Sequence, residues 1–497
     1  MPRLRFILLL AAGLSACAVG PDFQSPPPPA ADRFTEQPTP AETVAAATTG
    51  GAAQRLNPGQ DIPGAWWTLF HSARIEALVV QALKANPDLA AAQATLREAR
   101  ENRRAEQGAF FPTIDASASV TGERISSYEF GSAQRGTGSA IALYNPGLNL
   151  SYSPDLFGLI RRQVEQLGAQ VDYQQYELEA AYLSLSANVV TAALTEASLQ
   201  AQIDTTNDII RLYARELDVM QSRFALGGVS RADVLSQQAN LTASQATLPP
   251  LQKQLEQTRN QLAIYVGGTP SQFSGPTVDL AALTLPQDLP VSLPARFIEQ
   301  RPDIQAYEAL LHAATANVGV ATANLLPQIT ITGSYGREGT NPTNMFTPAG
   351  ILWSVAASLT QPIFEGGTLL ARRRAAVAAL DVAAAQYSST VNTAFQAVAN
   401  AIVAIQRDAE TLKASLQSEK VAADSLAVAR AQFAAGGITY VAVLQAEQTY
   451  QSARLNLVSA QAARFTDTVT LFQALGGGWW NRADVDASVA TCCGLMK

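Results

Sequence analysis

Two long stretches of the chain carry apolar side chains at the spacing of a coiled coil. In the first, from about Leu159 to Leu226, apolar residues recur at alternating intervals of three and four, without a proline. This is the pattern of a heptad seam along one face of a helix. About 65 residues at ~1.5 Å each predict a rod of ~100 Å, and such a rod must lie against other rods. The seam consists of Tyr182, Leu185, Val189, Ala192, Leu199, Ile203, Ile210, Tyr213, Leu217, Met220 and Phe224.

The second stretch repeats the first and ends in the same short glycine motif. Phe224 is followed by Gly227-Gly228, and Phe433 is followed by Gly436-Gly437, at a constant offset of about 209 residues that marks an internal duplication. Glycine adopts a positive φ without steric cost, so each pair predicts the tight turn of a long helical hairpin. The second seam consists of Val391, Phe395, Val398, Ile402, Ile405, Ala409, Leu412, Leu416, Ala423, Leu426 and Phe433.

Four shorter segments alternate between mainly apolar and mainly small polar side chains, at residues 113–121, 148–153, 328–335 and 351–360. A period of two predicts β-strands. A length of about nine residues, with one apolar face, fits a strand that crosses a membrane with lipid outside and water inside. An amphipathic sheet on a soluble core shows the same alternation and is the alternative for each segment taken alone.

The N-terminus reads as a bacterial lipoprotein signal. Arg3 and Arg5 precede the apolar run Phe6–Leu14, and Leu14-Ser15-Ala16-Cys17 has the order of a lipobox. Cleavage after residue 16 would leave Cys17 to accept diacylglycerol. A plain signal peptide with a chance cysteine is the alternative.

Together these patterns predict a membrane assembly of several copies. Four strands on a lipid-anchored chain, with no apolar helix of ~20 residues after the signal, favour the membrane. Four strands cannot close, and an open edge in hydrocarbon costs several kcal/mol per unpaired backbone group. Two copies give ~8 strands and a filled barrel, whereas three give ~12 and an open lumen. The small inward-facing Ser, Thr and Asn side chains favour three copies.

The order of the segments defines two structural repeats. Asn86-Pro87-Asp88 in the first half corresponds to Arg301-Pro302-Asp303 in the second, and Asp88 is expected to cap the helix that follows it. The segments predicted are a signal peptide (1–16), a lipid-anchored tether (17–60), a first repeat (61–270), a connector (271–294), a second repeat (295–476) and a C-terminal tail (477–497).

Composition narrows the classes of function. Only 15% of the 497 residues are charged and 47% are hydrophobic, which suits closely packed helices. The net charge of −7, without a basic cluster, argues against a nucleic-acid partner. Cys492 and Cys493 are adjacent and bridge poorly, and His71 and His312 are distant in sequence, so neither disulfides, a metal site nor any other cofactor is expected.

The chain resembles the outer membrane factor family, the TolC-like exit ducts, in the lipoprotein (NodT/OprM-like) branch that serves tripartite, RND-type efflux systems. The resemblance runs from residue 17 to about 476. It implies a mainly helical chain that contributes four strands to a trimeric 12-stranded β-barrel, continued by a long periplasmic α-helical barrel. The motifs that carry it are Cys17-Ala18-Val19-Gly20-Pro21-Asp22-Phe23, Asp155-Leu156-Phe157-Gly158, Pro362-Ile363-Phe364-Glu365-Gly366-Gly367 and the two Phe-x-x-Gly-Gly turns.

The same resemblance implies where the duct meets its partners. In the family the glycine turns, here Gly227, Gly228, Gly436 and Gly437, are periplasmic tips that contact an adaptor protein and close the duct at rest.

A constriction follows the second turn in the family, formed by an apolar residue and then an acidic one a helical turn later. These positions are Val441 and Gln445 here. Gln445 departs from the acidic pattern, so three amides would face the axis in place of carboxylates. An ordinary polar helix position is the alternative for Gln445. Asp233 is not assigned to this gate, because Ala442 stands at the matching position of the second copy.

The predicted function is that of a passive exit duct for small molecules across the outer membrane of a Gram-negative cell, lipid-anchored, with its helical body in the periplasm. Its expected partners are two further copies, an adaptor, an inner-membrane pump and lipid. No nucleophile with a base, phosphate-binding loop or metal cluster suggests an enzyme. The alternatives are the duct of a type I protein secretion system and a structural coiled-coil lipoprotein of the envelope.

Overall fold

The structure is a computed structural model that describes residues 18–29, 33–36, 38, 40–124 and 140–482. It divides into two compact units. The strand unit comprises the described parts of residues 18–25, 96–173 and 307–387, and the hairpin unit comprises those of 26–95, 174–306 and 388–482. The domain boundaries suggested by the sequence follow the duplication and remain predictions.

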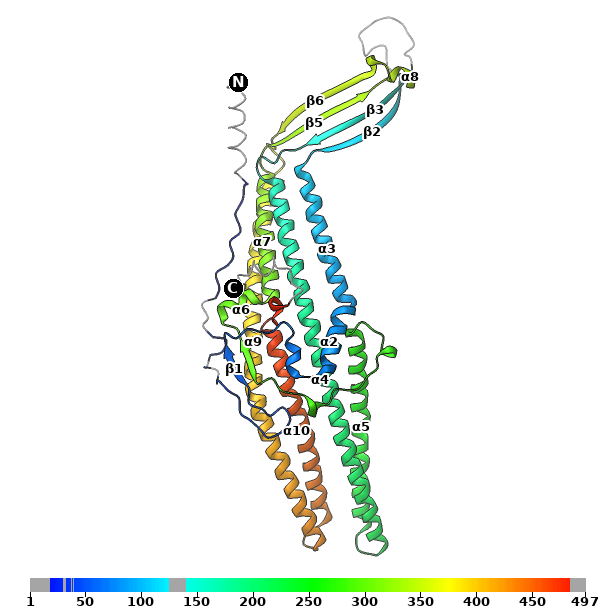
Figure 1. Cartoon of the computed structure of the whole chain (residues 1–497), viewed down its shortest axis with the longest axis vertical. Coiled ribbons are helices and arrows are strands. Elements are labelled where there is room, and N and C mark those ends of the chain that lie inside the picture. The colour runs from blue at the N-terminus through cyan, green and yellow to red at the C-terminus, as the bar shows by residue number, and fades with distance from the viewer. Residues whose placement is uncertain (1–17, 30–32, 37, 39, 125–139, 483–497) are drawn as a thin grey trace. The chain divides into compact units, whose positions relative to one another are not determined.

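Within the described residues, the strand unit contains one antiparallel sheet in the order β2-β3-β5-β6 (Figure 1). The strands are β2 (Thr113–Arg124), β3 (Ala140–Tyr152), β5 (Gln328–Arg337) and β6 (Ile351–Thr360). Each repeat supplies one β-hairpin. β3 of the first repeat pairs with β5 of the second, with Leu150 opposite Gly333. The predicted strands are confirmed. β2 and β6 end the order, so each pairs along one edge only in the described chain.

The register sorts the side chains of this sheet by polarity. Ile114 lies opposite Leu150, and Tyr335 lies opposite both Leu148 and Trp353, so apolar side chains share one face. Many large members of this face are exposed in the chain, among them Ile114, Leu148 and Trp353. On the other face polar groups pair across strands: Asn149 Nδ2 donates to Ser117 Oγ at 3.0 Å, and the Ser334 and Ser354 hydroxyls lie 2.8 Å apart. The sheet therefore presents a bare apolar surface opposite a polar one.

Long helices occupy most of the described chain. The predicted rods are α4 (Leu159–Ala225) and α9 (Thr368–Ala434), each 67 residues long, and α3 (Pro87–Gln107) and α7 (Pro302–Ala323) are shorter. All four contribute residues to both units. The N-cap of α3 is Asn86, whose Oδ1 accepts from the Asp88 and Leu89 backbone N–H groups at 2.9 and 3.1 Å. The expected Asp88 cap was wrong, because Pro87 is already the first helical residue.

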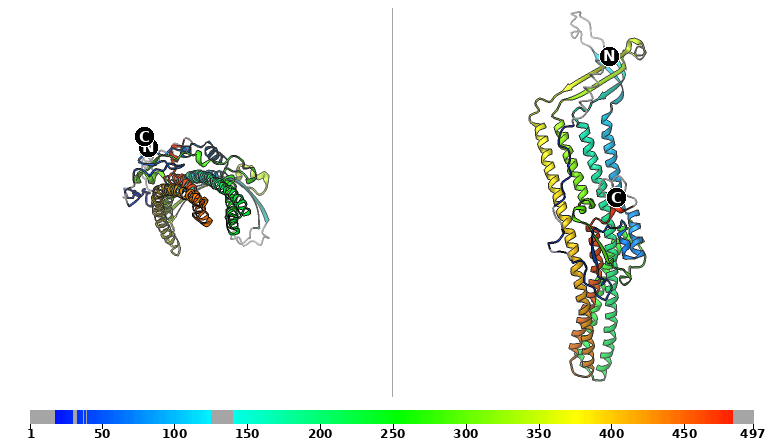
Figure 2. Two further views of the ribbon diagram at one scale, coloured as in Figure 1. Left: turned by 90° about the horizontal axis from the view of Figure 1, so that it is seen from below. Right: turned by 60° about the vertical axis from the view of Figure 1, so that its left-hand side comes forward.

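The hairpin unit contains the C-terminal parts of both rods and the helices that return from them. α4 turns into α5 (Arg231–Tyr265) and α9 turns into α10 (Tyr440–Ala474), and both returning helices are 35 residues long. Seen end-on, these helices stand side by side in a curved layer (Figure 2). No described helix combines the length and the apolar character needed to cross a membrane.

A compact core forms where the remaining elements of the hairpin unit meet. The Trp66 ring stacks on Phe472 at 5.5 Å, and the Trp479 indole N–H donates to the Gln300 carbonyl at 2.7 Å. Trp479 and Trp480, to which the sequence assigned no role, are thus buried packing residues. The elements around this core are β1 (Arg55–Pro58), β4 (Asp288–Val291), α2 (Ala73–Ala85), α6 (Pro294–Gln300) and the 3-10 helices Trp66–Phe70 and Trp479–Asn481.

Short elements complete the chain. They are α8 (Pro342–Met345) and the 3-10 helices Gly108–Phe110, Pro270–Gln272, Leu280–Ala282 and Pro348–Gly350.

Candidate functional site

The two glycine motifs form nearly identical turns in the hairpin unit. Gly227 and Gly436 have φ values of 74° and 73°, in the left-handed region. The Gly228 N–H donates to the Arg223 carbonyl at 2.8 Å, and the Gly437 N–H donates to the Gln432 carbonyl at 2.9 Å, so both rods end in a Schellman motif. No atom lies within 4 Å of a Cβ built on Gly227 or Gly436. Backbone conformation, rather than crowding, therefore requires glycine at these turns.

The two turns share one apolar cluster, so the structure brings the predicted tip residues together. Val229 follows the first turn, Ile438 follows the second, and both pack on the same buried residues. The Arg223 guanidinium of one hairpin lies over the Phe433 ring of the other, 5.8 Å from its centroid. The buried members of the cluster come from three helices and are Met220, Leu426, Tyr440, Val443 and Leu444.

The predicted constriction residues lie on α10, away from this packed face. Val441 is 63% exposed and Gln445 is also exposed, whereas Val443 and Leu444 between them are buried. Residues four apart lie on the same face of a helix. Val441 and Gln445 thus form a free surface on the chain, as lining residues of an axis completed by other copies would.

A partly buried ionic network lies beside the cluster and was not predicted from the sequence. Arg430 on α9 pairs with Glu216 on α4, and its Nη2 also donates to Glu447 Oε1 on α10 at 3.1 Å. The Glu447 side chain is only 1% exposed. Burial, followed by the neighbouring Glu216 carboxylate, raises the pKa of Glu447 to about 8. The signal in the sequence was a glutamate three and four residues after Leu444 and Val443, where the apolar seam of α10 would continue.

Uncharged polar groups extend this network between the two hairpins. The Tyr440 hydroxyl on α10 donates to Gln237 Oε1 on α5 at 2.9 Å, and Gln237 Nε2 donates to the Tyr213 carbonyl on α4 at 3.1 Å. Burial is the largest cause that raises the pKa of both tyrosines, followed by the charge of Glu447. Both phenols therefore remain neutral donors at physiological pH. Contacts from four helices thus hold the two hairpins together next to their turns.

A cavity of about 290 Å³ opens beside the network. Its lining includes the apolar residues Val219, Met220 and Val443 and the charged residues Arg215 and Arg430. It lies between residues of both hairpins.

Two other predictions concern sites away from the turns. Cys17, the predicted lipidation site, lies outside the described residues. Among the residues that the structure does describe, no group of three or more His, Cys, Asp or Glu side chains is placed to hold a metal ion.

The fold and the duplicated hairpins define the class of protein. The model of the family described as "Outer membrane efflux protein" matches residues 78–268 and 293–477, one segment in each repeat. The chain belongs to this family. Its members are outer membrane channels of efflux systems, so the chain is the outer membrane channel component of an efflux system.

Individual relatives agree with this assignment. The chain is 28% identical to the probable efflux pump outer membrane protein TtgC of Pseudomonas putida, over 96% of each chain. It is 24% identical to the probable outer membrane lipoprotein SilC of Salmonella typhimurium, over 94% of this chain and 96% of SilC. It superposes on the outer-membrane channel OprN with a TM-score of 0.82 at 27% identity, covering 93% of this chain and 100% of that structure.

These likenesses confirm the resemblance, the location in the outer membrane and the fold class predicted from the sequence. That fold class is a trimeric channel in which each chain supplies four strands and long helices in an internal duplication.

Proposed function

We propose that three copies of this chain form a passive exit duct that carries small molecules, received from an inner-membrane pump through a periplasmic adaptor, out of the cell. The observation that carries this proposal is the four-stranded sheet of the described chain, which has one bare apolar face and two outer edges. Small molecules are the expected cargo, because TtgC is described as a probable efflux pump outer membrane protein. The duct itself would carry out no reaction.

The sheet explains why copies must associate. Side chains as large as Trp353 and Val355 are 71% and 73% exposed, an arrangement that suits contact with lipid. In hydrocarbon the outer edges of β2 and β6 would each leave a row of unpaired backbone groups, at several kcal/mol per group. Pairing β6 of one copy with β2 of the next removes every edge. Three copies provide ~12 strands, enough for a water-filled lumen.

The tips are proposed as the gate and as the contact with the adaptor. Gly227, Gly228, Gly436 and Gly437 would meet the adaptor, and Val441 and Gln445 would line the constriction. The exposure of Val441 and Gln445 beside a packed face supports this role. A ring of three glutamines offers amide groups in place of fixed charges, so the gate would select weakly for cations.

Lipid attachment at Cys17 is proposed as the second membrane contact. The Leu14-Ser15-Ala16-Cys17 order supports it, as does the likeness to SilC, which is described as a probable outer membrane lipoprotein. Acyl chains on one cysteine would anchor each copy next to the barrel.

Conductance in planar lipid bilayers tests the channel directly. Purified full-length protein should run as a trimer in detergent and give discrete conductance steps. A structural lipoprotein of the envelope would give none, and a stable single-copy species without conductance would refute the proposal.

An export assay distinguishes an efflux duct from the duct of a type I protein secretion system. In a Gram-negative host without its own duct, the gene should restore resistance to small toxic compounds when the matching pump and adaptor are present. Restored secretion of a protein substrate instead would indicate a type I secretion duct.

A further inference from the structure

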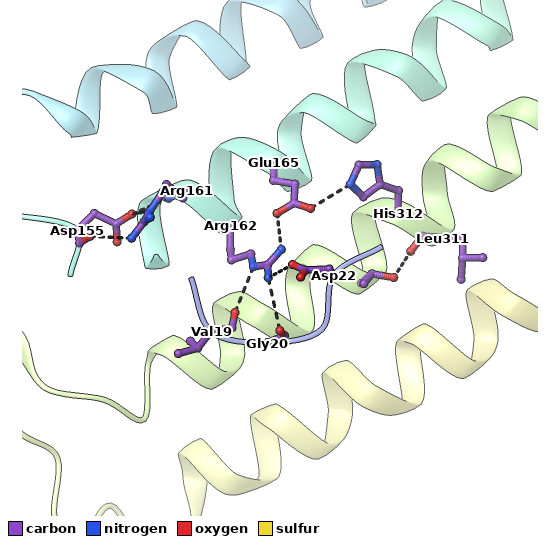
Figure 3. A network of polar contacts seen from close by, with 10 residues as sticks. Val19, Gly20, Asp22, Asp155, Arg161, Arg162, Glu165, Leu311 and His312 are labelled. Carbon is purple, nitrogen blue, oxygen red and sulfur yellow. Dashed lines mark hydrogen bonds and ion pairs between the residues drawn. The ribbon is translucent and has the colours of Figure 1, made fainter. Parts of the chain in front are cut away.

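The segment that follows the predicted lipidation site packs against helices within the strand unit. Residues 18–25 run beside the start of α4 and along α7 (Figure 3). The Val19 N–H donates to the Phe157 carbonyl at 3.1 Å, and Phe157 belongs to the short connection between β3 and α4. This backbone hydrogen bond fixes the segment at its first residues.

Arg162 on α4 binds the same segment through several donors. Its Nε donates to the Val19 carbonyl at 3.1 Å, and its Nη2 donates to the Gly20 carbonyl at 3.4 Å and to Asp22 Oδ1 at 2.7 Å. Its Nη1 donates to Glu165 Oε2 at 2.7 Å, one turn further along α4. The Arg162 side chain is only 4% exposed. A planar guanidinium can serve these acceptors at once, and the single ammonium of a lysine cannot.

The contact continues along α7. Glu165 Oε1 lies 3.0 Å from His312 Nε2 (Figure 3). The His312 ring stacks on Phe23 with centroids 4.4 Å apart. Ser25 Oγ donates to Glu308 Oε1 at 2.6 Å. The segment is therefore bound at each end and in the middle.

Glycines permit this close approach. Gly20 has a φ of 100°, and a Cβ on it would lie 2.5 Å from the Cα of Gly319 on α7. A Cβ on Gly319 would lie 2.9 Å from the Arg162 side chain, and a Cβ on Gly158 would lie 2.7 Å from Ala18. Three positions in this small area thus have no room for a side chain. Gly319 lies inside a helix, where glycine costs about 1 kcal/mol relative to alanine, so its presence fits a packing requirement.

We propose that Arg162 and Gly319 form an intramolecular docking site, the anchor clamp, which binds residues 18–25 and so fixes the lipidated N-terminus beside the strands. The inference rests on the proposed lipidation of Cys17 for its biological meaning. Ala18, the neighbour of Cys17, contacts Gly158, only a few residues after the end of β3 at Tyr152. Acyl chains on Cys17 would start at the level of the strand ends, so lipid and sheet would enter the same leaflet as one body. Arg162 is a positioning residue in this account.

Hydrogen exchange of the purified full-length trimer tests the clamp. Arg162→Gln and Arg162→Lys should each raise the exchange rate of backbone amides in residues 19–25 by at least about tenfold, because both lose the fork of donors. Arg161→Gln is the matched control: Arg161 is the adjacent residue and pairs with Asp155, 3.2 Å away. Its amides in residues 19–25 should exchange as in the wild type. Equal exchange in wild type and Arg162→Gln, or full protection in Arg162→Lys, would overturn the proposal.

Gly319→Ala is a second variant, which should release residues 19–25 without destabilising α7. Alanine raises helix propensity, so the amides of α7 should exchange no faster than in the wild type. The added methyl group should displace Arg162 and Gly20 and release residues 19–25. Retained protection of that segment in Gly319→Ala would contradict the proposed fit.

The position of the lipid gives a readout that general stability does not affect. A fatty acid with a photoreactive diazirine, incorporated during growth, should cross-link to residues near 152–158 in the wild type and in Arg161→Gln. In Arg162→Gln the same label should be incorporated in equal amount, but these cross-links should be lost. An absent label in the wild type would refute lipidation and leave the exchange result standing, whereas unchanged cross-links in Arg162→Gln would refute the clamp.

Discussion

The two hairpins of the duplicated chain keep the same geometry and differ in what stabilises them. Their rods, returning helices and turn angles match closely. In the first hairpin Ser230 and Asp233 form a capping box at the start of α5. In the second, Thr439 makes no side-chain cap bond and Ala442 replaces Asp233, but α10 buries many more residues than α5. Local hydrogen bonds thus stabilise the start of α5, and tertiary packing stabilises the start of α10.

This difference shows how a duplicated element can diverge without changing shape. Leu444 is buried, whereas Leu235, its counterpart about 209 residues earlier, is 53% exposed. Glu447 is buried in an ionic network, whereas its counterpart Gln238 is exposed. The first hairpin therefore keeps a free surface on α5, which suits a contact with a partner or a neighbouring copy. The second hairpin carries the core of the tip.

The largest expected effect is the loss of Tyr440. Tyr440→Ala removes a buried ring from the cluster and leaves Gln237 without its donor. It should destabilise the hairpin unit by about 3–5 kcal/mol. The matched control is Arg231→Ala at the corresponding position of the first hairpin, which is exposed and should change stability by less than about 0.5 kcal/mol. Denaturant unfolding monitored by proteolysis of the tips measures both, and equal costs would contradict the comparison.

The glycine turns should respond alike, because both have the same conformation. Gly227→Val and Gly436→Val each place a β-branched residue in the left-handed region, which should destabilise the turn by about 1–2 kcal/mol. Each should abolish efflux in a resistance assay, because the tip can no longer present its turn to the adaptor, while the amount of trimer in the membrane stays unchanged. Normal efflux in both variants would count against a role of the turns in docking.

The ionic network predicts that Glu447 on α10 makes stability depend on pH. The pKa of Glu447 is raised from 4.5 to about 8, so between these values the folded protein retains a proton that the unfolded chain releases. Stability should therefore fall as the pH rises from about 4.5 to about 8, and level off above that. Glu447→Gln should weaken this slope, with Glu216, Arg430, Tyr213 and Tyr440 still in place.

Melting temperatures from pH 5 to pH 8 measure the slope. Gln238→Glu, at the exposed counterpart of Glu447, is the control and should leave the slope of the wild type unchanged. An unaltered slope in Glu447→Gln would show that Glu447 is not the titrating group.

The parts of the structure that depend on local pattern could be predicted from the sequence. The first rod was expected from Leu159 to Leu226 and extends from Leu159 to Ala225, because a heptad seam and a terminal glycine are local signals. β3 was expected only over residues 148–153 but begins at Ala140. It includes Pro146-Gly147, which resemble a loop in isolation but pair with Ala118 and Ser117 of β2 in the sheet.

In the candidate site, too, only the parts that depend on local sequence could be predicted. The turns at Gly227 and Gly436 are set by short motifs, whereas the network joins Glu216, Arg430 and Glu447 from three helices. Long-range packing alone brings these three together. Glu216 and Arg430 resemble ordinary solvated charges in their own stretches of sequence, and only Glu447 has a local signal, its position on the apolar seam of α10. The Asn86 cap was missed for a smaller reason. Asn86 and Asp88 can both cap a helix, and Asn86 is the cap because Pro87, between them, is already the first helical residue.

The smallest expected effect concerns the cap that only the first hairpin has. Asp233 Oδ2 accepts from the Ser230 N–H at 2.9 Å, and the Asp233 N–H donates to Ser230 Oγ at 3.2 Å, so Asp233→Ala should cost about 1 kcal/mol. The reciprocal change, Ala442→Asp, places a carboxylate three residues after Thr439 and should stabilise α10 by a few tenths of a kcal/mol. Hydrogen exchange of the first-turn amides of α5 and α10 reports each effect separately. Fraying of the start of α10 in Ala442→Asp would instead show that a capping box is incompatible with the tertiary packing of Tyr440. The starts of α5 and α10 would then be stabilised in two mutually exclusive ways, α5 by its cap and α10 by its packing.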